Sequence, residues 1–433
     1  MKTTTHRLKL LGTPVQLLVL LFIQTLTIGI NNWTTNYVIQ ALLLDILILI
    51  GVYAFRGFEY DKSSNMNACF IAFFAGSIAG ILASLIPLLI FFTPRLPQMA
   101  FVTTIIGATI MNPLIFFVAT KTVIKSLPVK KFLIIGKQAE IEPIFKEIEE
   151  KSMGKIKAYM YMNPSAIVLE KEITAEQSFH QILIADPILE KTVEPQLQKA
   201  KRQGIEIDYL PNLTEEYLQR IPIHIAEKFK DYYEIAFDNV QESPAKRVLD
   251  VFISVFALTI LSPVLLFVAL WILIEDGRPV IFKQERIGKD GKPFIMHKFR
   301  SMKNERKNKA KFVTDEQHRI LKIGKILRPI RLDETPQFWD ILLGKMSFIG
   351  PRPEQVNFVK EYNEHIPFYS ERHRLKTGLT GWAQITYQYA ATREETARKL
   401  SYDLYYIKNR NTLFDLRIIL QTLEAVVWKK GAK

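Results

Sequence analysis

Four long apolar stretches in the first 120 residues constrain the fold of this chain more than any other feature. They cover approximately Val15–Ile30, Val38–Phe55, Ala68–Phe92 and Met99–Thr120. Each is close to the length that a helix needs to cross the hydrocarbon core, although the first is short and contains Gln16 and Gln24. We therefore predict four N-terminal transmembrane helices within residues 1–125. The alternative is a set of buried helices in a soluble protein.

The basic residues between these stretches predict their orientation. One side carries Lys2, Arg7, Lys9, Arg56, Lys62, Lys121, Lys125, Lys130 and Lys131. The opposite side carries only Arg95. Because cytoplasmic loops are rich in Lys and Arg, we expect both ends of this region to face the cytoplasm. Asp45, inside the second stretch, carries a cost that helix packing must offset.

The charge balance of the 433 residues suggests an anionic partner. The formal net charge is +14, and 48% of the residues are hydrophobic. Because the positive charge is spread over loops beside apolar runs, anionic lipid or a phosphorylated substrate is favoured over nucleic acid. The single cysteine, Cys69, excludes an intramolecular disulfide and a thiolate metal cluster.

Residues 126–240 have the alternating pattern of a soluble α/β domain. Strands are expected at Phe132–Gly136, Lys155–Tyr161, Gln181–Ala185 and Ile205–Tyr209, and helices at Glu140–Lys151 and Glu190–Arg202. This order predicts a Rossmann-like domain. The first strand lacks the Gly-x-Gly-x-x-Gly sequence of dinucleotide sites, because Gly136 is followed by Lys137, Gln138 and Ala139. A spacer, dimerisation or regulatory role is therefore favoured over catalysis.

A fifth apolar run, Val248–Ile274, is interrupted at its centre by Ser262-Pro263. Proline bends a helix, and the neighbouring serine can satisfy the carbonyl that proline leaves free. Both flanks are basic, with Lys246 and Arg247 before the run and Arg278, Lys283 and Arg286 after it. The positive-inside rule then places both ends in the cytoplasm. We predict a re-entrant membrane helix over residues 246–275, and a kinked fifth span is the alternative.

Residues 276–433 are expected to form a small α/β catalytic domain. Gly288 and the residues after it predict a turn that joins a strand at Val280–Arg286 to one at Pro293–Lys298. The basic run from Lys303 to Lys311 indicates a solvated loop, and contact with anionic lipid headgroups is the alternative. Apolar residues at helical spacing between Leu413 and Val427 predict an amphipathic helix, packed on the domain or lying in the membrane interface.

The stretch RPIRLDETPQFWDILLGKMSFIGPRP, from Arg328 to Pro353, contains the best candidate site. Asp333-Glu334 precede Thr335-Pro336, a pattern that predicts a helix from Pro336 to Leu343, capped by Thr335 and ended by Gly344. The carboxylate pair would then lie at the positive end of a helix, where backbone N–H groups suit a phosphate. Arg328, Arg331 and Arg352 surround the pair, although ordinary surface ion pairs would explain each residue alone.

Several motifs follow one another in order in the C-terminal half: FKQERIGKDGKPF, KFRSM, LRPIRLDETPQ, MSFIGPRPE and TGLTGWAQI. Together they resemble the bacterial sugar transferase family of monotopic phosphoglycosyl transferases, in its large polyprenyl-phosphate hexose-1-phosphate transferase form. The resemblance covers roughly residues 246–428. It implies transfer of a sugar-1-phosphate from a nucleotide sugar, by resemblance a UDP sugar, to polyprenyl (undecaprenyl) phosphate. Such a reaction begins exopolysaccharide, capsule or O-antigen synthesis.

The chemistry of this transfer suits the carboxylate pair. An aspartate is ionised at neutral pH and can form an acyl phosphate, so we assign Asp333 as the nucleophile of a covalent, ping-pong cycle. Glu334 is expected to assist a Mg²⁺ (or Mn²⁺) ion, which prefers oxygen ligands, so that the metal residues are Asp333 and Glu334. By resemblance, Lys298, Arg328 and Arg352 match basic positions of the active site. Gln337 and Gln384 are weaker candidates for polar contacts.

The resemblance also implies a bacterial inner-membrane protein with a cytoplasmic catalytic domain, and the extra domains are compatible with a homodimer. Three residues depart from the family pattern: Arg331, Thr335 and Lys345. Two other functions remain open: a membrane scaffold or regulator, and a conventional glycosyltransferase. The intact Asp333-Glu334 pair argues against the scaffold, and the lack of an Asp-x-Asp motif argues against the glycosyltransferase. The sequence does not identify the sugar.

Overall fold

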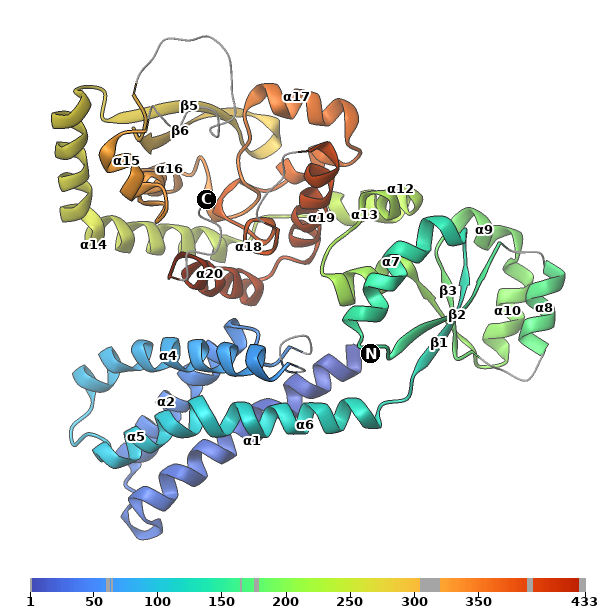
Figure 1. Cartoon of the computed structure of the whole chain (residues 1–433), viewed down its shortest axis with the longest axis horizontal. Coiled ribbons are helices and arrows are strands. Elements are labelled where there is room, and N and C mark those ends of the chain that lie inside the picture. The colour runs from blue at the N-terminus through green and yellow to red at the C-terminus, as the bar shows by residue number, and fades with distance from the viewer. Residues whose placement is uncertain are drawn as a thin grey trace. The chain divides into compact units, whose positions relative to one another are not determined.

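The computed structural model describes residues 2–59, 63, 65–163, 166–174, 179–303, 320–387 and 392–427. The chain folds as two units (Figure 1). The first unit comprises Met1–Lys131 with Lys146–Lys157, and the second comprises Phe132–Phe145 with Ala158–Lys433. Most of the basic run that begins at Lys303 lies outside the described residues.

The first unit is a bundle of apolar helices. They are α1 (Lys2–Ile28), α2 (Thr35–Ala54), α4 (Met66–Phe91), α5 (Gln98–Ile106) and α6 (Asn112–Ser126), and a π-helical turn at Gly107–Met111 joins the last two. Three stretches are long and apolar enough to cross a membrane, at Thr35–Ala54, Met66–Phe91 and Gln98–Val123. The apolar part of α1, Gly12–Ile28, is shorter. The prediction of several apolar helices is confirmed, and their number as membrane spans stays a prediction.

Close packing and buried hydrogen bonds between helices hold this bundle together. A Cβ atom on Gly76 would lie 2.5 Å from the Cα atom of Val52, so only glycine allows α2 and α4 to approach this closely. Gln24 of α1 donates a hydrogen bond of 2.9 Å to Asp45 of α2, and both side chains are buried. Polar side chains inside membrane segments are stable when they pair with one another. The polar residues that weakened two of the apolar stretches are therefore each other's partners.

The α/β domain contains a four-stranded sheet in the order β2-β1-β3-β4. Its strands are β1 (Lys130–Ile135), β2 (Ile156–Met162), β3 (Gln181–Ile184) and β4 (Glu206–Tyr209). The strand β3 pairs in parallel with both β1 and β4. Helices α7 (Gln138–Lys151), α8 (Ala166–Thr174), α9 (Pro187–Thr192) and α10 (Glu194–Arg202) follow the strands in turn. A parallel sheet with alternating helices confirms the predicted α/β class.

The crevice where such a sheet ordinarily binds ligands contains side chains of the chain itself. Ligands of open parallel sheets bind at the carboxyl ends of the strands, where the strand order reverses. That point lies between β1 and β3. Lys228, at the end of α12 (Ile223–Lys228), forms an ion pair of 3.0 Å with Asp186 after β3 and a second one with Glu140 of α7. This arrangement favours a structural role for the domain over a nucleotide site.

The remainder of the second unit is built on a long helix and a small α/β domain. The helix α14 (Pro244–Asp276) leads into an antiparallel hairpin of β5 (Ile281–Ile287) and β6 (Pro293–Phe299), which confirms the predicted turn. The other elements are α15 (Lys322–Leu327), α16 (Gln337–Leu342), β7 (Ser347–Ile349), α17 (Val356–His365), β8 (Gly378–Thr380), α18 (Trp382–Thr386), α19 (Arg393–Asn409) and α20 (Thr412–Val427). The predicted C-terminal helix is α20. Two further helices, α11 (Leu210–Leu213) and α13 (Lys230–Asp238), precede α14.

The helix α14 is bent into two arms at its centre (Figure 1). Pro263 cannot donate a backbone hydrogen bond, and the Ser262 hydroxyl instead donates one of 2.8 Å to the carbonyl of Thr259, four residues before the proline. The first arm packs beside the buried residues Ile341 and Met346. The second arm buries its own Val268 and Ile272 in a cluster with Phe299, Leu321, Ile323 and Leu327. Both arms therefore pack on the same small domain, and the predicted role of Ser262 and Pro263 in the kink is consistent with this geometry.

Candidate active site

The carboxylate pair lies in a 3-10 turn, Leu332–Glu334, between α15 and α16. The Thr335 hydroxyl donates to the carbonyl of Leu332 and does not cap a helix. The helix α16 begins at Gln337 and has only six residues. The predicted cap by Thr335 is therefore wrong, because the chain completes a separate turn before the helix starts. The helix-dipole site for phosphate stays a prediction. Gly344, with φ +77°, ends the helix region as predicted.

Glu334 is buried and surrounded by cations. Its carboxylate accepts a hydrogen bond of 2.5 Å from Arg352 and lies 3.4 Å from the Lys298 ammonium and 3.9 Å from the Arg331 guanidinium. Burial alone would raise the pKa of Glu334, but the positive charges of Arg352 and Lys298 outweigh it and hold that pKa below the ordinary value. Glu334 therefore stays ionised and serves as the anchor of a cationic cluster.

Asp333, the neighbouring residue, has a pKa that is shifted in the opposite direction. Within the described part of the chain, its half-buried carboxylate forms no ion pair, and it accepts a hydrogen bond from its own backbone N–H. Burial and the charge of Glu334 raise the pKa of Asp333, whereas the charges of Lys298 and Arg328 oppose the rise. Asp333 is therefore the more basic carboxylate of the pair and the one that is available to react.

Two of the predicted binding residues, Lys298 and Arg352, contact Glu334, and a third, Gln384, contacts Arg352. Lys298 comes from β6, Arg352 from the turn that follows β7, and Gln384 from α18. Burial lowers the pKa of the Lys298 ammonium, against the opposing charge of Glu334. The Arg352 guanidinium also lies 3.4 Å from the side-chain oxygen of Gln384, whose amide nitrogen has no partner among the described residues. The amide nitrogen of Gln384 is therefore available to donate a hydrogen bond to a ligand.

Arg328 and Gln337 have different surroundings. The Arg328 guanidinium is near enough to Asp333 to lower its pKa, and one of its terminal nitrogens is buried without a partner in the described structure. It can therefore bind an anion beside Asp333. Gln337 is only 2% exposed. It lies in the interior, so the predicted contact between Gln337 and a substrate is not supported.

Sequence reasoning missed the residues that support this cluster from behind. Arg286 of β5 lies 3.8 Å from Glu354, and Lys399 of α19 lies 3.4 Å from the same carboxylate. The Arg372 guanidinium donates to the backbone carbonyl of Arg352 at 3.0 Å. Arg286 and Glu354 stand inside the quoted motifs, but nothing in their spacing indicates that they pair.

A second missed pair connects the hairpin to α16. The ring of His297 lies 2.7 Å from the fully buried carboxylate of Asp340, which also accepts the backbone N–H of His297 at 2.9 Å. His297 precedes Lys298 on β6, and Asp340 follows the carboxylate pair by six residues. The pair therefore fixes the strand that carries Lys298 to the helix that follows Asp333 and Glu334.

The first arm of α14 holds the strand that leads to Arg352. Asp250 accepts hydrogen bonds of 2.9 Å from the Ser347 hydroxyl and from the Phe348 N–H. Lys246 donates one of 2.7 Å to the carbonyl of Ile349. Because Arg352 follows this strand directly, the bent helix positions a residue of the cationic cluster.

The donor set permits a divalent cation only in partnership with a substrate. No group of three or more His, Cys, Asp or Glu side chains in the described ranges could hold a metal ion. Glu334 already has three cationic partners, whereas the Asp333 carboxylate has no ion pair among the described residues. Mg²⁺ commonly binds one or two carboxylates and completes its octahedron with water and substrate phosphates. The pair fits a metal ion of that kind, and it does not fit a site made of protein ligands alone.

Comparison with known proteins gives consistent matches for the C-terminal half. A family model described as "Bacterial sugar transferase" matches residues 241–429. The chain is 41% identical over 189 residues to the UDP-N-acetylgalactosamine-undecaprenyl-phosphate N-acetylgalactosaminephosphotransferase of Aeromonas hydrophila, covering 43% of this chain and 45% of the relative. It is 40% identical over 181 residues to the UDP-glucose:undecaprenyl-phosphate glucose-1-phosphate transferase of Escherichia coli K12, covering 41% and 39%.

A shorter relative is matched over almost its whole length. The exopolysaccharide production protein PSS of Rhizobium leguminosarum bv. phaseoli is 41% identical over 186 residues, which are 41% of this chain and 92% of the relative. By contrast, the match spans less than half the length of the two relatives from Aeromonas and Escherichia. The similarity is therefore concentrated in the part of the chain that carries the carboxylate pair.

Proposed function

The chain belongs to the bacterial sugar transferase family, and from this premise we propose that it transfers a sugar-1-phosphate from a nucleotide sugar to a polyprenyl phosphate. The names of the relatives from Aeromonas and Escherichia contain a UDP sugar and undecaprenyl phosphate. We therefore propose a UDP sugar as the donor and undecaprenyl phosphate as the acceptor. The product would begin the synthesis of an exopolysaccharide, a capsule or an O-antigen.

One observation carries this proposal: two adjacent carboxylates have opposite environments. Glu334 is buried and ion-paired to Arg352, Lys298 and Arg331, whereas Asp333 has no ion pair among the described residues and has a raised pKa. A scaffold protein has no use for an unpaired, half-buried carboxylate beside such a cluster. A nucleophile needs to be free of partners, and a phosphate needs cations nearby.

The proposed reaction has two steps. In the first, an Asp333 oxygen attacks the phosphorus that bears the sugar, and the bond from that phosphorus to the bridging oxygen breaks. The bonding electrons leave with the nucleoside monophosphate, and the protein holds an acyl phosphate at Asp333. In the second step, an oxygen of polyprenyl phosphate attacks the same phosphorus. The acyl phosphate bond breaks, the Asp333 carboxylate is restored, and the lipid diphosphosugar is released.

The surrounding cations have distinct tasks in this scheme. Arg352 and Lys298 offset the charge of the transferred phosphate, and Arg328 binds an oxygen on the Asp333 side. The unpartnered amide nitrogen of Gln384 donates to another oxygen. A Mg²⁺ or Mn²⁺ ion, when bound, would neutralise phosphate charge, and Asp333 and Glu334 would hold it. Glu334 can bind the metal ion only if one of its cationic partners, Arg331, Arg352 or Lys298, moves to the phosphates of the arriving substrate.

We also propose that α14 is a re-entrant helix and that the catalytic domain is on the cytoplasmic side of the inner membrane. The support is that both ends of the helix are bound to that domain. At the first end, Arg247 donates to the carbonyls of Ile341 and Leu342. At the second, Arg300 donates to the carbonyl of Asp276. A helix held in this way by one soluble domain cannot place its ends on opposite sides of a membrane.

The membrane surface of α14 supports the same arrangement. Only 11% of its most apolar 18 residues are buried, and the side chains of Phe252, Phe256 and Phe267 are more than half exposed. Water is a poor environment for such a surface, and the hydrocarbon of the inner leaflet is a good one.

Cysteine labelling tests this topology, because Cys69 is the only native thiol. In a Cys69→Ser background, Lys289→Cys is expected to resist a membrane-impermeant maleimide in intact spheroplasts and to react after permeabilisation. Arg95→Cys, in the loop predicted on the other side, is expected to react in both. Labelling of Lys289→Cys in intact spheroplasts would exclude a cytoplasmic catalytic domain.

The reaction itself is tested with the full chain in membranes, supplied with radiolabelled UDP sugars and undecaprenyl phosphate. The wild-type protein is expected to release nucleoside monophosphate and, without the lipid, to retain label as an acyl phosphate that hydroxylamine removes. Asp333→Asn is expected to lose both signals, and Asp238→Asn, at an exposed carboxylate, to keep them. Unchanged transfer by Asp333→Asn would falsify the assignment of the nucleophile. A panel of UDP sugars identifies the donor.

A further inference from the structure

A half-open cavity of about 110 Å³ lies between α17, α19 and the 3-10 turn Tyr369–His373. Phe358 and Tyr362 of α17 form one wall, and Lys399 and Asp403 of α19 form the other. We propose that this cavity binds the nucleobase of the donor nucleotide, and that the base is a pyrimidine. The inference rests on the proposed function, because it assumes a nucleotide sugar as the donor.

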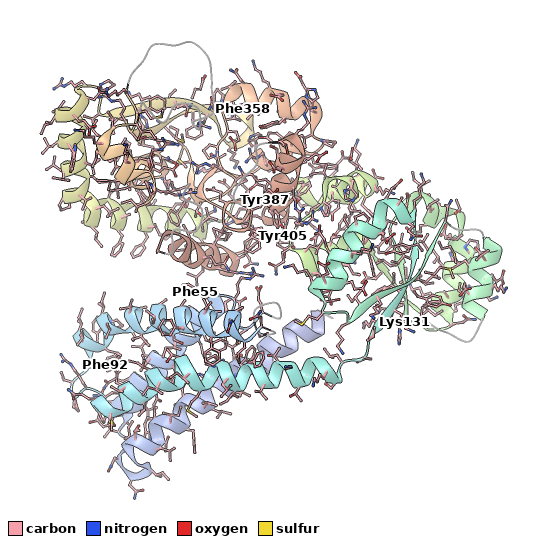
Figure 2. The ribbon with its side chains drawn as sticks, viewed as in Figure 1. Phe55, Phe92, Lys131, Phe358, Tyr387 and Tyr405 are labelled. Carbon is pink, nitrogen blue, oxygen red and sulfur yellow. The ribbon has the colours of Figure 1, made fainter. Side chains whose placement is uncertain are left out.

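The aromatic wall has the geometry of a stacking surface. The rings of Phe358, which is labelled on α17 in Figure 2, and Tyr362 are nearly parallel, with centroids 6.0 Å apart and an angle of 13° between their planes. A third ring, Tyr369, lies 5.3 Å from Tyr362. Aromatic side chains of this kind stabilise a bound base through its flat face.

A buried donor of the cavity has no partner in the described structure. Arg372 is 3% exposed, and its terminal nitrogens donate to the Tyr369 hydroxyl, the Arg352 carbonyl and the Asp403 carboxylate. The remaining nitrogen, Nε, is buried and makes no hydrogen bond there. A buried N–H group without an acceptor is costly, and a carbonyl oxygen of a ligand would remove that cost. Pyrimidine bases present such carbonyl oxygens on the edge of the ring.

The position of the cavity matches the order of groups along the donor. Asp333 attacks the phosphorus that bears the sugar, and the leaving nucleoside monophosphate departs in line, on the opposite side. Contacts lead away from Asp333 through Glu334 and Arg352 to Arg372, at the cavity. The proposal places the nucleoside at the far end of these contacts, beyond Arg352.

The size of the cavity agrees with one planar ring. A cavity of about 150 Å³ in another protein accommodates benzene, and the present one is smaller but open on one side. Because it is small and open on one side, we assign it a single six-membered ring, the smaller of the two kinds of nucleobase. The base would stack on Phe358 and accept a hydrogen bond from Arg372 at its edge.

Binding of uridine monophosphate to the full chain in nanodiscs tests this proposal without any turnover. Calorimetry is expected to show that Phe358→Ala weakens binding by about tenfold, the loss typical of one base–aromatic stack. Phe358→Tyr keeps the ring and is expected to stay within about twofold of the wild type. Tyr159→Ala, at an exposed aromatic residue of β2, is the matched control. Thermal unfolding of each variant establishes that it is folded.

Kinetics then separates the base from the sugar. Phe358→Ala is expected to raise the KM for the UDP sugar and the inhibition constant of uridine monophosphate in parallel, with little change in kcat. If uridine monophosphate binds Phe358→Ala as tightly as the wild type, or if only the choice of sugar changes, the cavity does not hold the base. A wild-type protein that binds uridine monophosphate but turns over no nucleotide sugar would instead contradict the proposed function and leave the base site intact.

Discussion

The ammonium of Lys246, in the first turn of the bent helix α14, donates a hydrogen bond of 2.7 Å to the carbonyl of Ile349, which is 103 residues further along the chain. The same ammonium lies 3.8 Å from the buried carboxylate of Asp415 in α20. One buried cation thus connects α14, the strand that precedes Arg352 and the C-terminal helix. The helix α14 is therefore part of the support of the candidate active site.

Replacing Lys246 by Met is expected to destabilise the protein by about 3 kcal/mol, because it leaves the buried Asp415 with one cation fewer. Thermal or denaturant unfolding in detergent measures this loss. Lys345→Met, which removes a lysine charge outside this network, is the control. The double variant Lys246→Met/Asp415→Leu is expected to recover part of the loss, and a double variant that is no better than the single one would contradict the pairing.

Replacing Arg352 by Ala is expected to lower kcat/KM by about a hundredfold, a loss comparable to that of one donor in a preorganised charge-stabilising site. Arg352→Lys keeps the charge but loses the planar fork, so we expect an intermediate value. Release of nucleoside monophosphate is the measurement. Arg374→Ala removes an arginine that pairs with Glu371 and Asp238 away from the cluster, and it is expected to have little effect.

The rate is expected to fall on the acid side at a pH above the ordinary pKa of an aspartate. Asp333 must be ionised to attack, and burial together with the charge of Glu334 raises its pKa. Glu334 has a lowered pKa and stays ionised through the same range. Because the Arg328 cation opposes the rise, Arg328→Gln is expected to move the acid limb of kcat/KM upward by up to about one pH unit. An unmoved limb would mean that Asp333 is not the titrating group.

The same pKa directions predict opposite effects on stability. The Glu334 carboxylate stabilises the fold above its unfolded-state pKa, and this contribution is lost as the pH falls through its lowered folded-state pKa. The Asp333 carboxylate destabilises the fold above its raised pKa. At neutral pH we therefore expect Asp333→Asn to raise the Tm while it abolishes activity, and Glu334→Gln to lower the Tm. A scan of Tm at several pH values checks both signs.

Replacing Pro263 by Ala is expected to straighten α14, because residue 263 can then donate to the carbonyl of Thr259. A straight helix cannot keep both arms on one domain, so activity should fall and some molecules should adopt a crossing orientation. Maleimide labelling of Lys289→Cys in intact spheroplasts measures that fraction. Ser262→Ala removes one hydrogen bond worth about 1 kcal/mol and should leave the topology unchanged.

Local patterns were sufficient for much of the architecture. Runs of apolar residues identified the helices of the first unit, alternating elements identified the parallel sheet, and the glycine-rich turn identified the hairpin. Each of these features depends on residues close in sequence, so it can be recognised before the tertiary structure is known. The same holds for Ser262 and Pro263, because the freed carbonyl of Thr259 is only four residues from the proline.

The details of the site depended on contacts between distant residues. The motifs identified Asp333, Glu334, Lys298 and Arg352, but not which carboxylate would be paired and which free. The expected helix cap at Thr335 failed because the residue bonds within its own 3-10 turn. Gln337 was assigned a substrate contact, but the fold buries it.

By itself, the sequence determined the apolar segments, the strands of the parallel sheet, the hairpin, and the motifs that place this chain in its family, because these properties reside in short stretches of residues. Only the tertiary structure decided that Glu334 would form ion pairs with Lys298 and Arg352 and that Asp333 would have no ion pair among the described residues. It also decided that Arg372 would line a cavity. Charges act through space, and the distances between them exist only after strands and helices far apart in the chain have packed together.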